Sequence, residues 1–304
     1  MVNYFILKGI SDVPILQVLT FYLVLFIYNI TLGGNWIILL LVCLDSHLHT
    51  PMYFFLCNLS ILNISSATVT LHKILSSIVI KNNVVPFNDC IAQVCMFSWL
   101  SGNEFILLTA MSYDRYVAIC NPLHYSAVMN GRVCVSLAIF CWSFSLLQML
   151  PAMVIVSRFS CYSSNTIDHF FCDMVALMNL SCSDTSILKL LIFTEGVLLS
   201  TFTPFLLTFV SYSFIIATIL RMKSTTGRSK AFYTCSSHIT VVVLHYTTIV
   251  CQYFTPRGTF MSSKLLSLLN TAVVPMLNPF IYSLKNKEVK SALWRQLKYF
   301  KSIV

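Results

Sequence analysis

Charged residues are scarce in this 304-residue chain. They make up 10% of the sequence, whereas hydrophobic residues make up 57% and the mean hydropathy is positive. A water-soluble domain carries roughly a quarter charged residues, because its surface has to meet water. The composition therefore excludes an ordinary soluble domain and indicates a protein embedded in lipid.

The patterns of several other classes of membrane protein are missing as well. The sequence has no repeat at a fixed period, which a secondary transporter usually shows, and no ring of charges of the kind that lines a channel. It contains neither HExxH nor GxSxG, so an intramembrane enzyme is not predicted. No cluster of Cys and His has the spacing of metal ligands, and we predict no metal and no cofactor.

Basic residues outnumber acidic ones, 19 to 10, which gives a formal net charge of +9. No basic stripe with interleaved aromatic residues is present, so we predict no nucleic acid partner and assign the excess charge to contact with anionic membrane lipid. Residues 1–20 lack a basic start and a small-residue cleavage site, so no cleavable signal is predicted. We expect a single domain over residues 1–304.

Seven long apolar runs are present instead. Crossing about 30 Å of hydrocarbon takes about 20 apolar residues in a helix, and these runs are too long for barrel strands. The sequence therefore predicts an all-α, seven-transmembrane helix bundle, with spans near 21–44, 53–80, 92–120, 133–156, 188–220, 232–254 and 265–284.

The distribution of Lys and Arg predicts the orientation of the bundle. Basic residues gather after the third and fifth runs and in the C-terminal tail, and cytoplasmic segments near span ends are enriched in them. We therefore expect a multi-pass plasma membrane protein with an extracellular N-terminus and a cytoplasmic C-terminus. The tail, residues 286–300, has its apolar side chains on one helical side, which is typical of a short helix lying along the membrane interface.

Four cysteines are expected to face the outer, oxidising side. Three lie in the loop near 157–187 (Cys161, Cys172 and Cys182) and Cys90 begins the third span. Four cysteines allow three pairings, and the residues alone do not choose among them.

An acidic and a basic residue stand side by side where the third run ends, Asp114 and Arg115 in "MSYDRYVAIC". Charges at this depth are costly to bury unless they are paired. A breakable ion pair at a helix end can act as a latch, whereas a lone Arg115 would extend to the lipid headgroups.

Motifs along the whole chain resemble, in order, those of the rhodopsin-like G-protein-coupled receptors, and within them the olfactory receptors. The motifs are "GN" at 34–35, "LHTPMYFFL" at 48–56, "MSYDRYVAIC" and "NPLHY" at 111–125, "HFFCD" at 169–173, "SCSDT" at 181–185, "SYSFI" at 211–215, "KAFYTCSSHIT" at 230–240 and "PMLNPFIYSLKNKEVK" at 275–290.

This resemblance implies two disulfides, Cys90–Cys172 and Cys161–Cys182. It also implies that Asp114 holds Arg115 at rest and that activation moves Arg115 toward Tyr212 and Tyr282, while the sixth span swings outward to admit a heterotrimeric G protein. The switch residues implied in this way are Asp114, Arg115, Tyr116, Tyr212, Tyr246, Asn278, Pro279 and Tyr282. Pro279 removes a backbone hydrogen bond and loosens its helix, so that its neighbours can reorient.

The buried polar residues expected along the spans are Asn35, Asn63 and Glu104. In the family, the position of Glu104 usually pairs with an aspartate on the second span to form a sodium site, but that position is Asn63 here. We therefore predict that Glu104 is at least partly protonated and hydrogen-bonded to Asn63 or Asn278, and that sodium binds poorly. The family's "FYG" is also altered, to His245, Tyr246 and Thr247, and we expect His245 to be packed and neutral.

The ligand is expected among the third, fifth, sixth and seventh spans, at their outer halves. Candidate lining residues, taken from depth and family analogy, are Phe97, Ser98, Ser101, Gly102, Ser200, Ile249, Val250, Tyr253, Leu268 and Thr271. None of them is charged, so we predict a small volatile organic ligand that is uncharged and mostly apolar.

The function predicted from this resemblance is that of an odorant receptor that activates a stimulatory G protein and raises cyclic AMP. The alternatives are a chemosensory receptor for a metabolite and, in a different class, a membrane transporter. Asn179 in the outer loop is the candidate glycosylation site.

Overall fold

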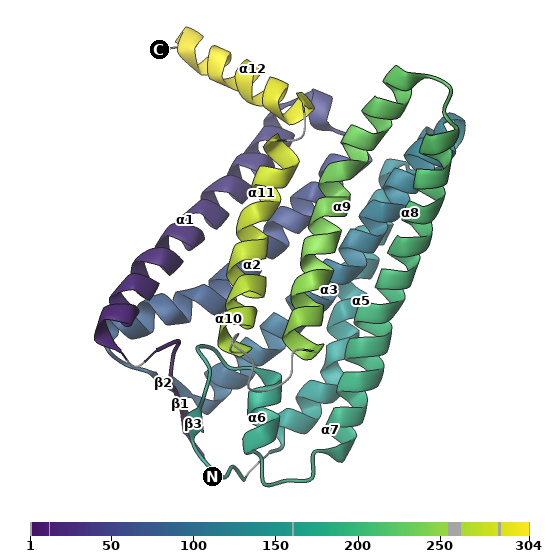
Figure 1. Ribbon diagram of the computed structural model, residues 1–304. Coiled ribbons are helices and arrows are strands. Elements are labelled where there is room, and N and C mark those ends of the chain that lie inside the picture. Colours follow the sequence, from purple (N-terminus) through teal and green to yellow (C-terminus); the bar gives the residue numbers. More distant parts are fainter. Residues whose placement is uncertain (1, 12, 160, 255–262, 285–286, 304) are drawn as a thin grey trace.

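A computed structural model describes residues 2–11, 13–159, 161–254, 263–284 and 287–303, which form a bundle of long helices (Figure 1). Within these described residues, seven helices are long and apolar enough to cross a membrane: Pro14–Leu44, Pro51–Ile80, Phe87–Cys120, Gly131–Ser157, Ser186–Arg221, Thr225–Cys251 and Lys264–Tyr282. The prediction of a predominantly helical seven-span bundle is confirmed. The first helix begins earlier than its apolar run, at Pro14, because a proline is well placed in the first helical turn.

Four of the spans are single helices in the chain's first half: α1 (Pro14–Leu44), α2 (Pro51–Ile80), α3 (Phe87–Cys120) and α5 (Gly131–Ser157). The local sequence sets their ends. Pro51 opens α2, Lys81 closes it in a left-handed conformation (φ 54°), and the side chain of Asn130 accepts a hydrogen bond from the Val133 amide at the start of α5.

The fifth and seventh spans are each built from three consecutive pieces. The fifth comprises α7 (Ser186–Leu191), the π-helix η3 (Ile192–Phe202) and α8 (Thr203–Arg221). The seventh comprises α10 (Ser263–Leu268), the π-helix η4 (Leu269–Val273) and α11 (Val274–Leu284). The sixth span is α9 (Thr225–Phe254). Wide turns of this kind are uncommon and are often found at functional sites.

The connections between spans carry short elements: η1 (Ser46–Leu48), η2 (Pro122–His124), α4 (Tyr125–Val128) and α6 (Met174–Leu180). A small sheet in the order β2-β1-β3 joins β1 (Tyr4–Leu7) to β2 (Val84–Pro86) and β3 (Thr166–Ile167). This sheet, which the sequence had not predicted, closes one end of the bundle, called here the sheet end. The N-terminus lies there (Figure 1).

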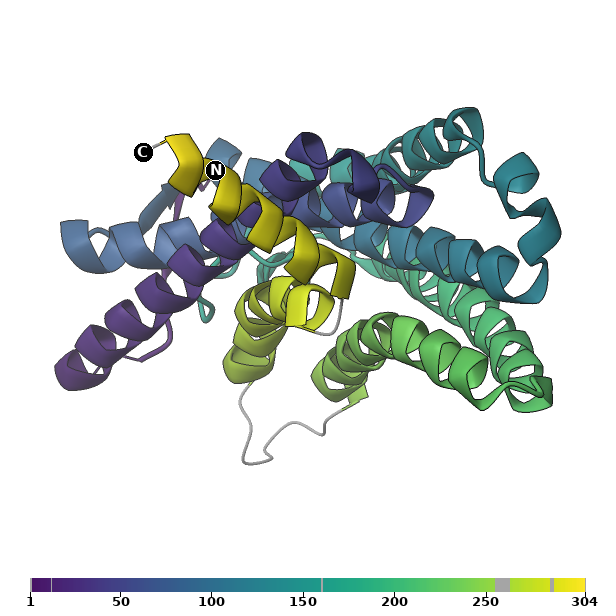
Figure 2. The ribbon, with the colours of Figure 1, turned by 90° about the horizontal axis from the view of Figure 1, so that it is seen from above.

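The opposite end is called the α12 end, after the helix α12 (Lys287–Ile303). Seen from above, α12 lies across the end of the bundle (Figure 2). It buries Val289 and Ala292 and leaves Leu293, Trp294 and Leu297 exposed. An exposed apolar side next to basic residues is the pattern expected of a helix on a membrane surface.

The main apolar core runs through the middle of the bundle and joins α1, α2, α3, α5, α9 and α11. A second cluster lies beneath the sheet and contains Phe5, Val85, Ile167 and Cys172. The two cores hold the polar residues described next between them and along the α12 end.

Candidate functional site

Asp114 and Arg115 form a buried ion pair at the α12 end of α3. The Nε of Arg115 donates to the Oδ2 of Asp114 at 2.9 Å, and its Nη2 contacts the same oxygen. Asp114 is fully buried and Arg115 is 9% exposed. Removing one partner of such a pair leaves an uncompensated charge, at a cost of about 3–5 kcal/mol.

A third residue completes this cluster. The hydroxyl of Tyr125, on α4, donates to the Oδ1 of Asp114 at 2.7 Å. Burial, followed by the charge of Asp114, raises the pKa of Tyr125, so the hydroxyl keeps its proton and remains a donor. The sequence had not assigned a role to Tyr125, which "NPLHY" places 11 residues after Asp114, beyond the end of α3.

Two further tyrosines of the predicted switch lie within electrostatic reach of Arg115, Tyr212 on α8 and Tyr282 on α11. The hydroxyl of Tyr212 is hydrogen-bonded to Nδ1 of His238 at 2.5 Å. The hydroxyl of Tyr282 is buried and finds no hydrogen-bond partner among the described residues. Both tyrosines are thus near Arg115 while Arg115 is still held by Asp114.

The other switch residues occupy separate positions. Tyr116 packs edge-on against Phe214, with ring centroids 6.0 Å apart. Tyr246 packs against Phe105 and Phe205, and its hydroxyl donates to the Thr201 carbonyl at 3.5 Å. These contacts connect α3, α9 and the fifth span.

Three asparagines form a chain of hydrogen bonds across the bundle. The amide nitrogen of Asn278 donates to Asn63 at 3.1 Å, and that of Asn63 donates to Asn35 at 3.0 Å. Next to Asn278, Pro279 lies inside α11 and approaches Gly34 on α1. The seventh, second and first spans are therefore tied together by amide groups.

The contacts of Glu104 differ from those predicted for it. Among the described residues, no hydrogen bond joins it to Asn63 or Asn278, because those two amides bond to each other and to Asn35. Its carboxylate faces His245 on α9 instead, with Oε1 3.7 Å from Nδ1. His245 is buried, as predicted for a packed residue, but its partner was missed.

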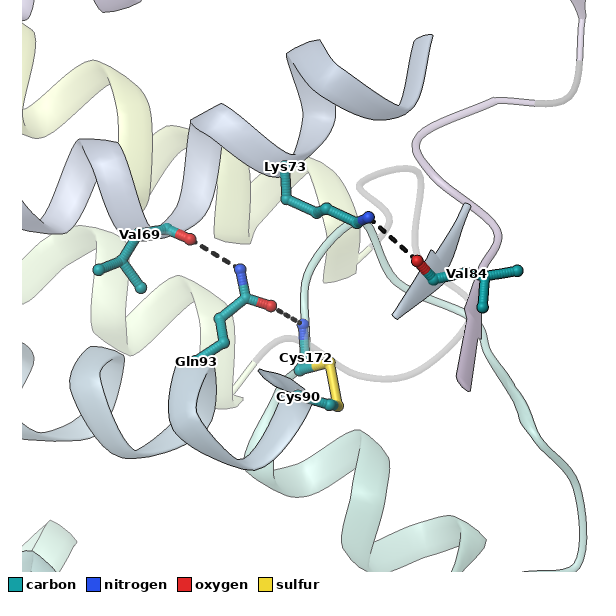
Figure 3. Close-up of a disulfide and its surroundings, with 6 residues drawn as sticks. All are labelled: Val69, Lys73, Val84, Cys90, Gln93 and Cys172. Atoms are coloured by element: carbon teal, nitrogen blue, oxygen red, sulfur yellow. Dashed lines mark hydrogen bonds between the residues drawn. A yellow bond between two sulfur atoms is a disulfide. The ribbon is translucent and has the colours of Figure 1, made fainter. Parts of the chain in front are cut away.

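At the sheet end, a disulfide joins Cys90 to Cys172 (Figure 3). Gln93 on α3 reinforces this link: its side-chain oxygen accepts from the Cys172 amide at 2.9 Å, and its side-chain nitrogen donates to the Val69 carbonyl at 2.7 Å. The loop that follows β3 is thus fixed to both α2 and α3.

The second predicted disulfide is not formed in the structure. Cys161 and Cys182 are exposed thiols, although the Cys182 amide donates to the Cys161 carbonyl at 3.1 Å and Tyr162 pairs with Ser181. The two cysteines are neighbours, and their pairing stays a prediction.

The same loop reaches the seventh span through two contacts. Nζ of Lys264 lies 2.8 Å from Oδ1 of Asp168, and this interaction holds the pKa of Asp168 below its usual value. His169 is 6% exposed and contacts Ser267 at 3.3 Å. Burial, followed by the charge of Lys264, lowers the pKa of His169 to about 4, so the imidazole is neutral near pH 7.

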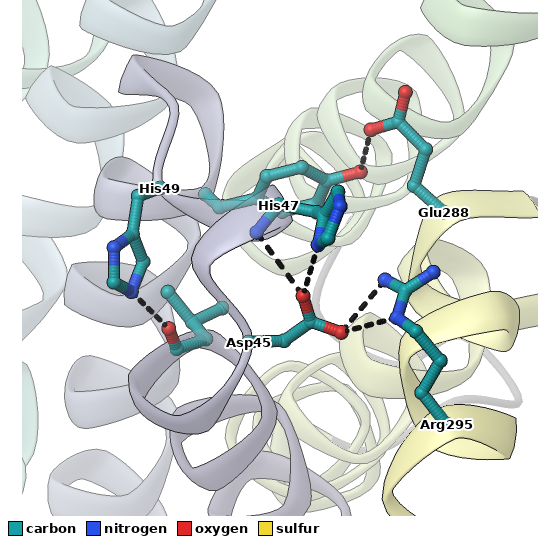
Figure 4. Close-up of polar contacts among 7 residues, drawn as sticks. Asp45, His47, His49, Glu288 and Arg295 are labelled. Atoms are coloured by element: carbon teal, nitrogen blue, oxygen red, sulfur yellow. Dashed lines mark hydrogen bonds and ion pairs between the residues drawn. The ribbon is translucent and has the colours of Figure 1, made fainter.

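At the α12 end, Asp45 holds α12 in place (Figure 4). Its Oδ2 accepts from Nε of Arg295 at 2.8 Å, and its Oδ1 caps η1 by accepting from the His47 amide. Burial alone would raise the pKa of Asp45, but the hydrogen bonds from Arg295 and His47 outweigh it and lower that pKa. Tyr53 adds a second tie by donating to Glu288 at 2.7 Å.

Comparison with known proteins identifies the family to which these features belong. The family described as "Olfactory receptor" matches residues 24–299. This chain belongs to the olfactory receptor family. It is 46% identical to human olfactory receptor 6C1 over 293 residues, which cover 96% of this chain and 94% of the relative. It is 44% identical to the dog olfactory receptor-like protein OLF3 over 298 residues, covering 97% and 93%.

Among solved structures, the chain resembles squid rhodopsin with a TM-score of 0.71 at 20% identity, covering 96% of this chain and 88% of that one. The fold is therefore that of a rhodopsin-like seven-helix bundle. The family predicted from the motifs is confirmed, and this olfactory receptor is a G-protein-coupled receptor rather than an enzyme.

The structure separates the residues predicted to line the ligand pocket of this receptor into two groups. Phe97 packs against Phe171 with centroids 5.0 Å apart, in a cluster that also contains Leu268. Gly102 instead lies next to the fifth span: a Cβ built on it would be 4.0 Å from Oγ of Ser200.

The remaining pocket candidates are less clearly grouped. Ser98, Ser101 and Ile249 are half-buried, and the Thr271 hydroxyl bonds to the Ser267 carbonyl within its own helix. Val250 is 52% exposed and is not brought into the interior, and the side chain of Tyr253 lies outside the described part of the chain. Two hollows on the protein, on α1 around Phe26 and at the sheet end around Phe87, contain none of these residues.

Sequence reasoning also missed a polar group in the outer part of the fifth span. Glu195 in η3 has a buried Oε2, and Gln148 on α5 has a buried side-chain nitrogen, and neither atom has a hydrogen-bond partner among the described residues. Ser200 donates to the Gln148 side-chain oxygen at 2.8 Å. The signal was present as a single acid within the apolar run 188–220.

Proposed function

We propose that this chain is an odorant receptor that binds a small, uncharged, mostly apolar organic molecule among the third, fifth, sixth and seventh spans near the sheet end. Binding activates a stimulatory, olfactory-type G protein and raises cyclic AMP. In this proposal the sheet end faces the outside, the α12 end faces the cytoplasm, and the receptor works at the plasma membrane.

The observation that carries this proposal is the latch at the α12 end. Asp114 holds Arg115 by two contacts and is itself held by Tyr125. Tyr212 and Tyr282 lie near enough to interact electrostatically with Arg115, and in the described structure neither is hydrogen-bonded to it. An arrangement with a second set of partners waiting nearby has two discrete states, which a switch requires.

The residues predicted to line the pocket support this class of ligand. They present aromatic and aliphatic surface from Phe97 and Leu268 together with hydroxyls such as that of Ser200. Mostly apolar sites with a few polar groups bind small organic molecules, and affinity is modest because few heavy atoms contribute. Glu195, whose buried Oε2 has no hydrogen-bond partner among the described residues, favours a hydrogen-bond donor or an amine, so amines belong in any ligand screen.

The orientation is supported by the positive-inside rule. The α12 end carries Arg132, Arg221, Arg228 and Lys290, whereas the sheet end contains acids that offset its basic residues, such as Asp168 beside Lys264. The disulfide at the sheet end requires an oxidising compartment, which agrees with an outward-facing sheet.

A panel of volatile compounds, read out as cyclic AMP in cells that express the receptor, tests the proposal. We expect at least one neutral volatile to raise cyclic AMP in the wild type and not in Arg115→Ala. Asp114→Asn should raise the ligand-free signal roughly fivefold or more, because it frees Arg115 from its ion pair.

Surface abundance of each variant, measured by antibody to a tag, serves as the control for folding. If amines activate the wild type and Glu195→Gln abolishes that response, the proposed class of ligand is wrong, but the proposed receptor function stands. Cyclic AMP responses that persist in Arg115→Ala at normal surface abundance would overturn the proposed switch.

A further inference from the structure

Glu104 and His245 meet in the middle of the bundle, where the sequence predicted no contact between them. Oε1 of Glu104 lies 3.7 Å from Nδ1 of His245, and their side chains are 11% and 4% exposed. Within the described residues, neither ring nitrogen of His245 nor this carboxylate oxygen has a hydrogen-bond partner. Phe105 covers the imidazole edge-on, with centroids 4.6 Å apart, and shields it from lipid and water.

Among the described residues, the nearby polar side chains form no hydrogen bond with Oε1 of Glu104 or with the ring of His245. Asn63, which stands where a second acid would reinforce a cation site, is hydrogen-bonded to Asn35 and Asn278. Both polar side-chain atoms of Asn103, next to Glu104, are buried without a partner among the described residues. Among the described residues, the ion pair given for Glu104 is the one with the His245 imidazole.

The other titratable or charged groups on the packed elements are already engaged or lie apart. Tyr212 on α8 bonds to His238 on α9, and Asp114 and Arg115 bond to each other. Other groups of this kind include Tyr246 on α9, Tyr282 on α11, Cys141 on α5 and Glu195 in η3. Among them Tyr282 interacts electrostatically with both Glu104 and Arg115.

Electrostatics limits the protonation states of this pair. A lone carboxylate or a lone imidazolium in the bundle interior carries a heavy desolvation cost. The pair is neutral overall only when it holds one proton, either on the imidazole beside a carboxylate or on the carboxyl beside a neutral imidazole. A separation of 3.7 Å exceeds a direct hydrogen bond by a few tenths of an ångström, and a small shift of α9 or one bridging water closes it.

We propose that Glu104 and His245 are a proton-binding pair that ties α9 to α3 in the resting receptor. One proton lies between Oε1 and Nδ1 at rest. When α9 moves away from α3, the pair separates and its proton can leave to water. The role of this tie in signalling rests on the proposed function, since the outward movement of the sixth span is the step that breaks it.

Thermal unfolding of the purified full-length receptor in lipid nanodiscs tests the pair without ligand or G protein. The variants are Glu104→Met, which is similar in shape but apolar, His245→Phe and the double variant. Each single variant should lower the melting temperature, because it leaves one polar partner buried and alone, and the double variant should recover most of the loss. His245→Asn keeps a polar side chain that does not titrate and serves as the second variant if His245→Phe does not fold.

A pH series gives the second readout. The melting temperature of the double variant, which has lost both titratable groups, should change less with pH than that of the wild type. Two results would contradict the proposed pairing of Glu104 with His245. One is a decrease in melting temperature in the double variant that equals the sum of the two single decreases, and the other is a pH profile that is unchanged in all three variants. Stabilisation by sodium over choline that Glu104→Gln alone abolishes would contradict it as well, because a bound cation would then occupy the acid.

Basal nucleotide exchange on an added G protein connects the pair to signalling. Each single variant should raise it about fivefold or more, a size typical of coupling between two sites. An odorant screen without hits would leave the unfolding results intact, and additive unfolding losses would leave the screen intact, so the two proposals fail separately. Unchanged basal exchange despite a positive unfolding cycle would overturn the signalling role.

Discussion

At the scale of single residues, several buried polar atoms in the described part of the receptor have no protein partner. Within the described residues, Ser60, Asn103, Asn278 and Tyr282 each have at least one buried polar atom of this kind. Leaving such a group unpaired costs about 1–3 kcal/mol, and ordered water is the usual remedy. These atoms lie on α2, α3 and α11.

Contacts between residues adjacent in the chain could be proposed from the sequence, but contacts between residues on different spans could not. Asp114 and Arg115 are neighbours in the chain, so an ion pair between them could be proposed, and the family resemblance favoured it over an Arg115 extended to the headgroups. Glu104 and His245 belong to different spans, and their meeting depends on how α3 and α9 pack. The sequence correctly marked both as exceptional residues, yet it offered Asn63 and Asn278 as partners for Glu104, because it could not show that the amides prefer each other.

His169 gives a pH prediction at this scale. Its pKa is lowered to about 4 by burial, whereas an unfolded histidine titrates near 6.5. The folded form therefore resists a proton that the unfolded form accepts. Its contribution to stability is complete above pH 6.5 and is lost as the pH falls toward 4, by up to about 3 kcal/mol. The melting temperature of the purified receptor should fall over this window.

The variant His169→Asn, which does not titrate, should flatten that fall. Removal of the exposed His124 in His124→Asn is the matched control and should leave the profile unchanged. Equal pH profiles in the wild type and His169→Asn would show that the histidine does not control this part of the stability.

At the scale of elements, the spans followed from the apolar runs, whereas the irregular parts did not. The wide turns of η3 are seen in bonds such as that from the Thr201 hydroxyl to the Gly196 carbonyl five residues earlier. Thr and Gly occur in many ordinary helices, so composition gave no signal for the change of period. The wider turn sets which side of the fifth span carries Glu195 and Ser200.

The contact between α1 and α11 gives a prediction for an element. A Cβ on Gly34 would lie 3.0 Å from Cβ and 3.2 Å from Cγ of Pro279. Gly34→Ala should therefore push α11 away from α1 and destabilise the receptor. Gly33→Ala is the matched control, because in the described structure its Cβ would meet no atom within 4 Å.

Both substitutions gain the same helix propensity, so their difference isolates the crowding. We expect Gly34→Ala to be less stable than Gly33→Ala by about 1–3 kcal/mol, the usual cost of overpacking. Thermal unfolding of the two purified variants measures this difference. Equal stability would mean that α11 gives way freely at Pro279.

At the scale of the whole molecule, the disulfide and the small sheet join segments that the sequence separates widely. The Cys90–Cys172 bond spans 82 residues, and the three strands come from the N-terminus and two loops. The motifs indicated the disulfide through family resemblance. The sheet gave no such signal, because strands of two to four residues carry almost no period and their pairing is entirely non-local.

Loss of the disulfide gives a prediction for the whole molecule. Cross-linking over such a separation constrains the unfolded chain by about 4 kcal/mol in the chain-entropy treatment. The double variant Cys90→Ser/Cys172→Ser should melt at a clearly lower temperature and reach the cell surface in smaller amounts. Cys43→Ser, which removes an exposed thiol on α1, should change neither.

Peptide mapping by mass spectrometry without reduction checks the same bond directly. It should recover the peptides of Cys90 and Cys172 joined in the wild type, and it also reports whether Cys161 and Cys182 are linked. Separate Cys90 and Cys172 peptides, or an unchanged melting temperature in the double variant, would contradict the stabilising role.

The position of β1 in the middle of the small sheet has a consequence for biosynthesis. The ribosome makes β1 first, yet its partners β2 and β3 end at Pro86 and Ile167. In the proposed orientation the strand would wait in the lumen of the secretory pathway while four spans insert, and its pairing could be completed only after more than half of the chain has been translated. A bulky fusion before Tyr4 would therefore interfere with the last stage of closing this end rather than with membrane insertion.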